Sequence, residues 1–248
     1  MSNVMYQIET NVAAKRKMLA VLIDPDKCSD LNTGRYLENL KLHTPDFIFM
    51  GGSQLKSSFS NLIGLFRSEL GIPVVLFPGD VSQFSPDADA LLFLSLLSGR
   101  NAEYLVGQHI KVALKLRDSA LEVIPTGYLL VDGGCKSAVE YVSNTQPIPD
   151  NATEIAIATA LAGVFLGMKL IYLEAGSGAH LPVPLPMIRE VKNNIQVPLI
   201  VGGGINTAEK LYDAFSSGAD LVVIGNVLES SPEKIVLFKE IQNQFNAV

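Results

Sequence analysis

The segment 169–178 reads Lys-Leu-Ile-Tyr-Leu-Glu-Ala-Gly-Ser-Gly, an apolar run followed directly by a carboxylate and a glycine loop. The apolar part predicts a buried strand over 170–174. The glycines permit positive φ angles and close approach of the backbone, so that backbone N–H groups can converge on an anion. The segment therefore predicts a strand end that can hold a ligand of the size of a phosphate.

Two later apolar runs end in the same way. The run at 198–201 is followed by three glycines at 202–204, and the run at 220–224 is followed by Gly225 and Asn226. In (β/α)8 barrels the phosphate site is often formed by the loops after strands seven and eight. Although each glycine pair alone fits an ordinary turn, three such ends favour a TIM-type barrel over the alternative, an open doubly wound sheet.

The rest of the chain alternates strand and helix patterns. Strands are expected at 18–23, 46–50, 73–77, 89–94, 122–131, 170–174, 198–201 and 220–224, and helices at 29–42, up to 70, at 101–118 and from about 153. The segment after 77 is too short and polar for a full helix, so an irregular segment is expected in place of the third helix. With no break in composition, the pattern predicts a single (β/α)8 barrel domain over 1–248.

Composition narrows the class of protein. The chain has 248 residues, 48% of them hydrophobic, with a net charge of −6 and no dense basic run, which argues against a nucleic-acid partner. Two cysteines and three histidines show neither zinc spacing nor a disulfide framework, so a reducing cytoplasm is expected. The longest uncharged apolar run, 155–168, has 14 residues, too few to span a bilayer, and predicts a buried or half-buried helix.

Glu174 stands at the carboxyl end of a predicted barrel strand, where it should face the reaction space. It could hold or deprotonate a substrate hydroxyl; alternatively it is a solvated loop carboxylate or the partner of a neighbouring lysine. Tyr172 points to the same side and could touch a phosphate or simply fill the barrel. Asn226 could donate its amide to a phosphate oxygen. His180 follows the loop in an extended, proline-rich segment and receives no role.

Asp24 and Ser53 follow the ends of the first and second predicted strands. Their oxygens suit Mg²⁺, which takes few protein ligands and completes its shell with water and substrate phosphate oxygens. Both residues also fit as helix caps, and this alternative stays open. Lys27, three residues after Asp24, either pairs with a diphosphate or with a surface acid.

Taken together, these motifs resemble the geranylgeranylglyceryl phosphate synthase family, which includes the bacterial heptaprenylglyceryl phosphate synthases. The similar segments lie in order along nearly the whole chain, at 21–27, 51–53, 144–149, 172–178, 201–205 and 225–226. The resemblance implies a prenyltransferase that forms an ether bond between a polyprenyl diphosphate, expected to be geranylgeranyl diphosphate, and the C3 hydroxyl of sn-glycerol 1-phosphate. Diphosphate is released, and the product belongs to phospholipid biosynthesis.

The same resemblance assigns roles to single residues. It implies Mg²⁺ bound by Asp24 and Ser53, with Glu174 as the catalytic residue. It also implies a homo-oligomer, while the short apolar runs predict that there is no transmembrane segment. The residues implied to bind glycerol 1-phosphate are Tyr172, Leu173, Glu174, Ala175, Gly176, Ser177, Gly178, Gly203, Gly204, Gly225 and Asn226.

A prenyl chain needs an apolar groove, and the irregular segment after Phe77 is where we expect it. Phe77, Phe93 and Tyr128 are candidate walls, although each also fits as ordinary core. Two other functions remain open. One is another phosphate-binding barrel synthase or isomerase, which need not keep Asp24 with Ser53; the other is a non-catalytic barrel that binds a phosphorylated metabolite.

Overall fold

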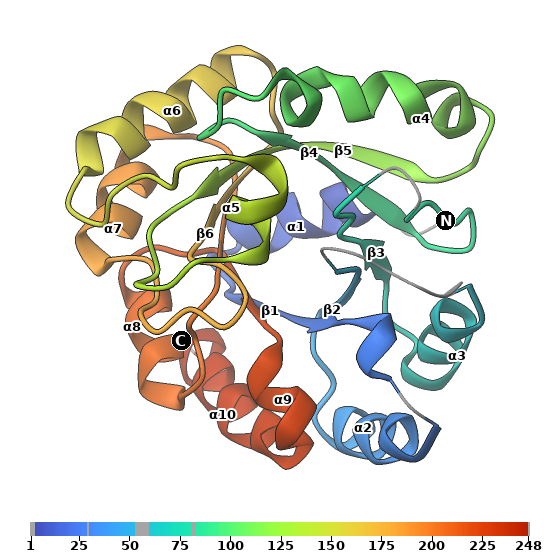
Figure 1. Cartoon of the computed structure of the whole chain (residues 1–248). Coiled ribbons are helices and arrows are strands. Elements are labelled where there is room, and N and C mark those ends of the chain that lie inside the picture. The colour runs from blue at the N-terminus through green and yellow to red at the C-terminus, as the bar shows by residue number, and fades with distance from the viewer. Residues whose placement is uncertain (1–2, 29, 53–59, 81–82, 248) are drawn as a thin grey trace.

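Eight parallel strands close into one barrel in chain order, with helices around the outside (Figure 1). The computed structural model describes residues 3–28, 30–52, 60–80 and 83–247. The last strand pairs with the first, with Met18 beside Leu221 and Val21 beside Ile224. The predicted (β/α)8 barrel is therefore confirmed, and the doubly wound alternative is wrong because an open sheet would leave these two strands unpaired.

All eight expected strands are present, with ends shifted by a residue or two. Most of them are continuous apolar runs, because parallel strands are buried on both faces, against the barrel interior and against the outer helices; β5 is the most polar of the eight. Their bounds are β1 Met18–Ile23, β2 Phe47–Met50, β3 Val74–Leu76, β4 Ala90–Leu96, β5 Glu122–Leu130, β6 Leu170–Glu174, β7 Leu199–Gly202 and β8 Leu221–Ile224.

The helices follow the expected order. They are α2 Asp30–Leu42, α3 Ser60–Leu70, α4 Gln108–Arg117 after the π-helical turn η2 Glu103–Gly107, α5 Ala138–Ser143, α6 Thr153–Phe165, α7 Leu185–Asn194, α8 Ala208–Ser216, α9 Asn226–Ser230 and α10 Ile235–Asn246, with 3₁₀ turns η1 Pro25–Lys27 and η3 Pro232–Lys234. The apolar helix α6 is half-buried as expected, with Ala156 and Ala160 inside and Phe165 exposed. None of the described helices is long and apolar enough to cross a bilayer.

An additional helix, α1 Val4–Ala13, has no counterpart in the sequence prediction. It crosses the far end of the barrel in Figure 1, where Val4 and Ile8 are fully buried against the interior side chains. The Glu122 carboxylate accepts hydrogen bonds from the backbone N–H groups of Val4 and Met5, at 2.6 and 3.1 Å. The helix closes the amino-terminal end of the barrel, and in the described part of the chain the pocket at the mouth lies at the opposite end.

Between β3 and β4 the described residues contain no helix, as the sequence predicts. The buried Gln83 organises this segment: its amide donates to the Gly52 carbonyl at 2.6 Å and accepts from the Gly79 N–H at 3.0 Å. Because the described part of this connection contains no helix, its residues 78–80, Gln83 and Phe84 can line a groove together with β4 and the facing helix α4.

Candidate active site

The open end of the barrel holds a pocket of about 500 Å³, here called the mouth pocket. It is formed where the carboxyl ends of the strands meet, the position at which barrel enzymes place their active sites. The predicted site residues that line it are Asp24, Tyr172, Glu174, Gly176, Ser177, Gly178, Gly203, Gly204, Gly225 and Asn226. Residues from the first and the last three strands are thus brought to one cavity.

Three predicted site residues differ from this pattern. Leu173 and Ala175 are buried in the core between the barrel and its outer helices, so their side chains do not line the mouth pocket. The backbone N–H of Ala175 is also occupied, since it donates to the Gly202 carbonyl at 3.0 Å. Strand alternation explains both placements, because neighbours of the inward-facing Tyr172 and Glu174 must point outward. Ser53 lies outside the described residues.

Glu174 is 6% exposed and ends β6 inside the mouth pocket. Burial raises the pKa of its carboxyl to about 7, and the neighbouring Tyr172 hydroxyl and Gly176 N–H partly offset this rise. The Gly176 N–H donates to Oε1 at 2.8 Å, which fixes the direction of the carboxylate. No described residue accepts from the buried Tyr172 hydroxyl in good hydrogen-bond geometry. Glu174 is therefore a positioned carboxylate that can exchange a proton near neutral pH.

The glycines after β6 and β7 allow the two loops to touch. Gly176 and Gly203 have φ angles of 101° and 80°, in the region that favours glycine. A Cβ atom on Gly203 would collide with the Glu174 carboxylate and the amide nitrogen of Ala175. Gly203 therefore does more than form a turn, because any side chain at this position would displace the Glu174 carboxylate.

Asn226 begins α9, directly after β8, and faces the β6 loop. Its side-chain carbonyl accepts a hydrogen bond from the Ser177 hydroxyl at 3.2 Å. Because this contact occupies the oxygen, the amide N–H₂ group is the end left to donate into the mouth pocket, beside Gly178. The loop after β7 leads into α8, where the side chain of Thr207 caps the helix by accepting from the Lys210 N–H.

Asp24 caps the turn η1, as the capping alternative expects: its Oδ1 accepts from the Asp26 N–H at 3.1 Å. The other oxygen, Oδ2, lies 3.7 Å from the Lys27 ammonium. Lys27 also pairs with Glu229 on α9. Capping thus uses one oxygen of Asp24, and a second carboxylate oxygen remains for a ligand in the mouth pocket.

A second, largely apolar pocket adjoins the mouth pocket and is here called the groove. The two pockets share Phe77, Tyr128 and Val139. The Phe77 ring centroid lies 6.1 Å from that of Tyr128 and 5.4 Å from that of Tyr172. The three predicted wall residues Phe77, Phe93 and Tyr128 all line the groove, and so does the irregular segment after Phe77.

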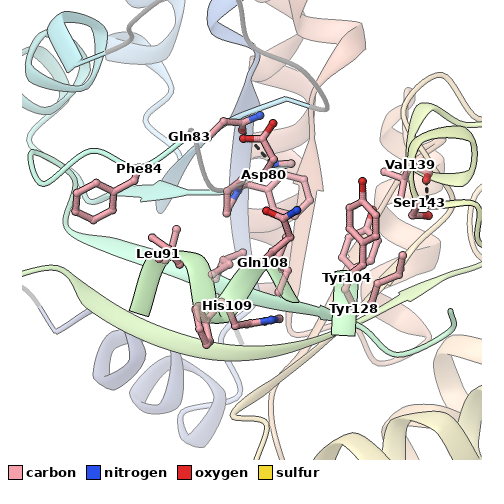
Figure 2. Close-up of a pocket in the computed structure, with 18 of the residues that line it drawn as sticks. Asp80, Gln83, Phe84, Leu91, Tyr104, Gln108, His109, Tyr128, Val139 and Ser143 are labelled. Atoms are coloured by element: carbon pink, nitrogen blue, oxygen red, sulfur yellow. Dashed lines mark hydrogen bonds between the residues drawn. The ribbon is translucent and has the colours of Figure 1, made fainter. Parts of the chain in front are cut away.

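Figure 2 shows Phe84 and Leu91 at the end of the groove away from Tyr104, Tyr128 and Val139. Pattern reading did not single out Tyr104 or His109, which come from η2 and α4. His109 packs edge-on against Phe93 with ring centroids 4.2 Å apart, and burial lowers its pKa. In the sequence, Tyr104 and His109 could be assigned only to the helix predicted at 101–118, and the sequence does not indicate which part of the barrel that helix faces.

Comparison with known proteins agrees with this architecture. Residues 11–243 match the family model described as the PcrB family. The geranylgeranylglyceryl phosphate synthase of Zunongwangia profunda is 50% identical over 220 residues, 88% of this chain and 94% of the relative. The protein of that name from Korarchaeum cryptofilum is 39% identical over 231 residues, 92% of this chain and 94% of the relative.

A solved structure is similar over its full length. It is the (S)-3-O-geranylgeranylglyceryl phosphate synthase of Thermoplasma acidophilum in complex with its substrate sn-glycerol-1-phosphate, with a TM-score of 0.92 and 33% sequence identity, covering 100% of both chains. The resemblance seen in the motifs is confirmed by the match along the whole sequence. The chain belongs to the PcrB family.

Proposed function

We propose that this protein is a prenyltransferase that joins sn-glycerol 1-phosphate to the prenyl group of a polyprenyl diphosphate through an ether bond. One observation carries the proposal: two unlike pockets meet at Phe77 and Tyr128. The mouth pocket offers glycine loops and a carboxylate, while the groove is largely apolar. A reaction between a small phosphorylated alcohol and a long hydrocarbon needs both environments, joined at the reacting atoms. The names of the relatives and the bound ligand of the Thermoplasma enzyme support the same reaction.

The bond changes follow from this arrangement. The C3 hydroxyl oxygen of glycerol 1-phosphate forms a bond to the first carbon of the prenyl chain. The bond between that carbon and the diphosphate oxygen breaks, and diphosphate leaves with the electron pair. The hydroxyl proton passes to Glu174, whose pKa of about 7 suits a general base at neutral pH.

The acceptor is held by the half of the mouth pocket that follows β6, β7 and β8. Backbone N–H groups of the glycine loops and the amide of Asn226 are donors suited to a phosphate. Gly203 allows this phosphate loop to lie against Glu174, so binding the phosphate also places the glycerol hydroxyl beside the carboxylate.

We also propose that Mg²⁺ assists the reaction and that Asp24 is one of its ligands. Mg²⁺ is often bound by one or two carboxylates together with water and substrate phosphate oxygens. Asp24 fits this requirement because its Oδ2 is not used in capping η1. Ser53 remains the predicted second ligand. When bound, Mg²⁺ would offset the negative charge that develops on the departing diphosphate.

The groove is proposed to hold the prenyl chain, with the reacting end at Phe77 and Tyr128 and the tail toward Phe84 and Leu91. Each buried methylene contributes about 0.8 kcal/mol, so the usable length of the groove sets the preferred donor. We propose geranylgeranyl diphosphate, because the relatives described above carry that group in their names.

The experiment is to incubate the purified chain with sn-glycerol 1-phosphate, Mg²⁺ and prenyl diphosphates of increasing length. We expect an ether product by mass spectrometry, most abundant with the geranylgeranyl donor, and loss of activity with EDTA that added Mg²⁺ restores. Absence of an ether product with every donor would overturn the proposal. Binding of glycerol 1-phosphate without turnover would favour the non-catalytic alternative.

A cytoplasmic location and a homo-oligomeric state are predictions from the sequence that we retain. The exposed Phe165 and Leu166 at the end of α6, 83% and 72% exposed, support an interface between copies. Light scattering during size-exclusion chromatography measures the oligomeric state, and a monomer at micromolar concentration would contradict that prediction.

A further inference from the structure

Lys27 is the one lysine or arginine among the described residues that line the mouth pocket. The same lining includes two carboxylates, Asp24 and Glu174. The proposed reaction brings a phosphate and a diphosphate into this pocket together. Since like charges repel strongly at short range where water is partly excluded, the position of this cation matters for binding two anions.

Lys27 is held at the junction of the first and last strands. Its ammonium group donates to both carboxylate oxygens of Glu229, at 3.0 and 2.9 Å, and lies 3.7 Å from Asp24 Oδ2. Lys27 is on η1 after β1, whereas Glu229 is on α9 after β8. The ion pair therefore exists because the barrel closes between these two strands.

We propose that Lys27 binds the diphosphate of the prenyl donor and that Glu229 positions the lysine until the donor arrives. This inference rests on the proposed function. A diphosphate oxygen that approaches Asp24, with or without a bound metal ion, comes within reach of an ammonium group 3.7 Å away. Hydrogen bonds between an ammonium and a phosphate are charge-assisted and strong.

The exchange of partners is feasible because neither side chain is locked in the interior. The Lys27 side chain is 47% exposed and that of Glu229 is 25% exposed. An ion pair of this exposure contributes little net stability, and water can solvate Glu229 after the lysine turns to the diphosphate. A flexible four-carbon stem lets the ammonium move between the two acceptors.

The diphosphate is a better partner for Lys27 than the acceptor phosphate. In the proposed function, the N–H groups of the glycine loops and the Asn226 amide already donate hydrogen bonds to the phosphate of glycerol 1-phosphate. Lys27 instead shares its turn with Asp24, the proposed ligand of the metal that accompanies the diphosphate. Lys27 therefore lies beside the proposed site of the leaving group.

The test uses steady-state kinetics of two substitutions with opposite expected effects. Lys27→Met should raise the KM for geranylgeranyl diphosphate about tenfold, the loss expected for one charge-assisted hydrogen bond. The KM for glycerol 1-phosphate should stay within about twofold. Glu229→Gln should instead lower the KM for the donor about threefold, because the lysine no longer has to leave a carboxylate. Lys27→Arg should restore most of the donor affinity.

A matched control is the ion pair between Arg35 on α2 and Glu233 on η3, 2.9 Å long, which likewise links the region after β1 to the region after β8 but lies outside the mouth pocket. Arg35→Met should leave both KM values unchanged. Calorimetric titration of the full chain with inorganic diphosphate, with and without Mg²⁺, gives a readout that does not depend on turnover, and Lys27→Met should weaken this binding.

Three results would overturn the inference. The first is that Lys27→Met binds diphosphate as tightly as the wild type, and the second is that Lys27→Met raises only the KM for glycerol 1-phosphate. The third is that Lys27→Met and Glu229→Gln lose donor affinity to the same extent. The last would mean that the pair only joins η1 to α9. If the wild type forms no ether product, the proposed function fails, whereas the diphosphate titration still decides whether Lys27 binds that anion.

Discussion

The two halves of the barrel mouth are built differently. After β6 and β7 the walls are mostly backbone, shaped by glycines such as Gly176 and Gly203 that have positive φ angles. Beside β3 and β4 the walls of the groove are mostly side chains, such as Phe84 and Phe93. The first half suits a small anion of fixed size and the second a hydrocarbon of variable length.

Substitutions in the two halves should therefore have different effects, on the rate in one half and on the choice of donor in the other. Backbone N–H groups are the same in every residue, so the glycine half changes only when a side chain is forced into it. The groove is lined mostly by apolar side chains, and substitutions among those at its end change its length. Substitutions in the first half should decide whether the reaction occurs, and those in the second should decide which donor is used.

The largest effect is expected for Glu174→Gln. Removing a general base should lower kcat about 10²- to 10⁴-fold, with little change in the KM for glycerol 1-phosphate, because the amide keeps the shape of the carboxyl. Single-turnover assays with purified protein measure this effect. Glu190→Gln, on the exposed face of α7, is the control and should have wild-type activity. Wild-type kcat in Glu174→Gln would exclude the proposed role.

The same substitution should stabilise the fold at high pH. Folding raises the pKa of Glu174 from 4.5 to about 7, so the carboxyl costs stability as pH rises from about 4.5 to 7 and the full cost is present above 7. Glu174→Gln should therefore gain about 3 kcal/mol at pH 8 and nothing at pH 4. Urea unfolding at both pH values tests this, and a loss of stability at pH 8 would contradict it.

The next effect concerns Gly203→Ala. The added Cβ would collide with the backbone nitrogens of Ala175 and Gly176 in the phosphate loop as well as with Glu174, and the displaced loop should raise the KM for glycerol 1-phosphate about 30-fold, equivalent to about 2 kcal/mol. Gly71→Ala is the matched control, since Gly71 has a φ angle of 66° but no atom within 4 Å of an added Cβ. Both variants share the backbone strain, so only the first should lose acceptor affinity. Equal KM values would place the acceptor elsewhere.

The pH dependence of kcat/KM should follow Glu174. Because the base must be deprotonated, kcat/KM should fall about tenfold per pH unit below the pKa of about 7 and level off above it. A profile measured from pH 5 to 9 gives the apparent pKa. In Glu174→Gln the residual activity should lose this dependence, and an unchanged profile would assign the pKa to another group.

The smallest effect is expected for Phe84→Ala at the far end of the groove. Removing this ring should lengthen the groove. The ratio of kcat/KM for a longer donor to kcat/KM for the geranylgeranyl donor should rise about fivefold, which is less than the full burial free energy of a few additional methylenes. Phe165→Ala, at an exposed position on α6, is the control. Competition between two donors in one tube measures the ratio, and an unchanged preference would place the end of the chain elsewhere.

Much of the fold could be predicted from short stretches of the sequence. Each strand is a short apolar run, and the glycines at 202–204 mark one strand end as clearly in the sequence as in the structure. The carboxylates of Asp24 and Glu174 were also identifiable, because they directly follow or end such runs. The placement of Leu173 and Ala175 could have been predicted as well, since strand alternation turns them away from the mouth pocket.

Other features depend on residues far apart in the chain. Helix α1 was missed because its two buried residues, Val4 and Ile8, form too weak a pattern, and its burial depends on the barrel above it. The Lys27–Glu229 pair spans residues that only barrel closure brings together.

The amino-acid sequence was enough to predict the strands, the glycine loops that follow them and the position of Glu174 at a strand end, because each depends on residue types that are adjacent in the chain. The raised pKa of Glu174, the partner of Lys27 and the junction of the groove with the mouth pocket depend instead on how distant segments pack. Burial and distance between separate strands control these properties, and both are set when β8 closes against β1.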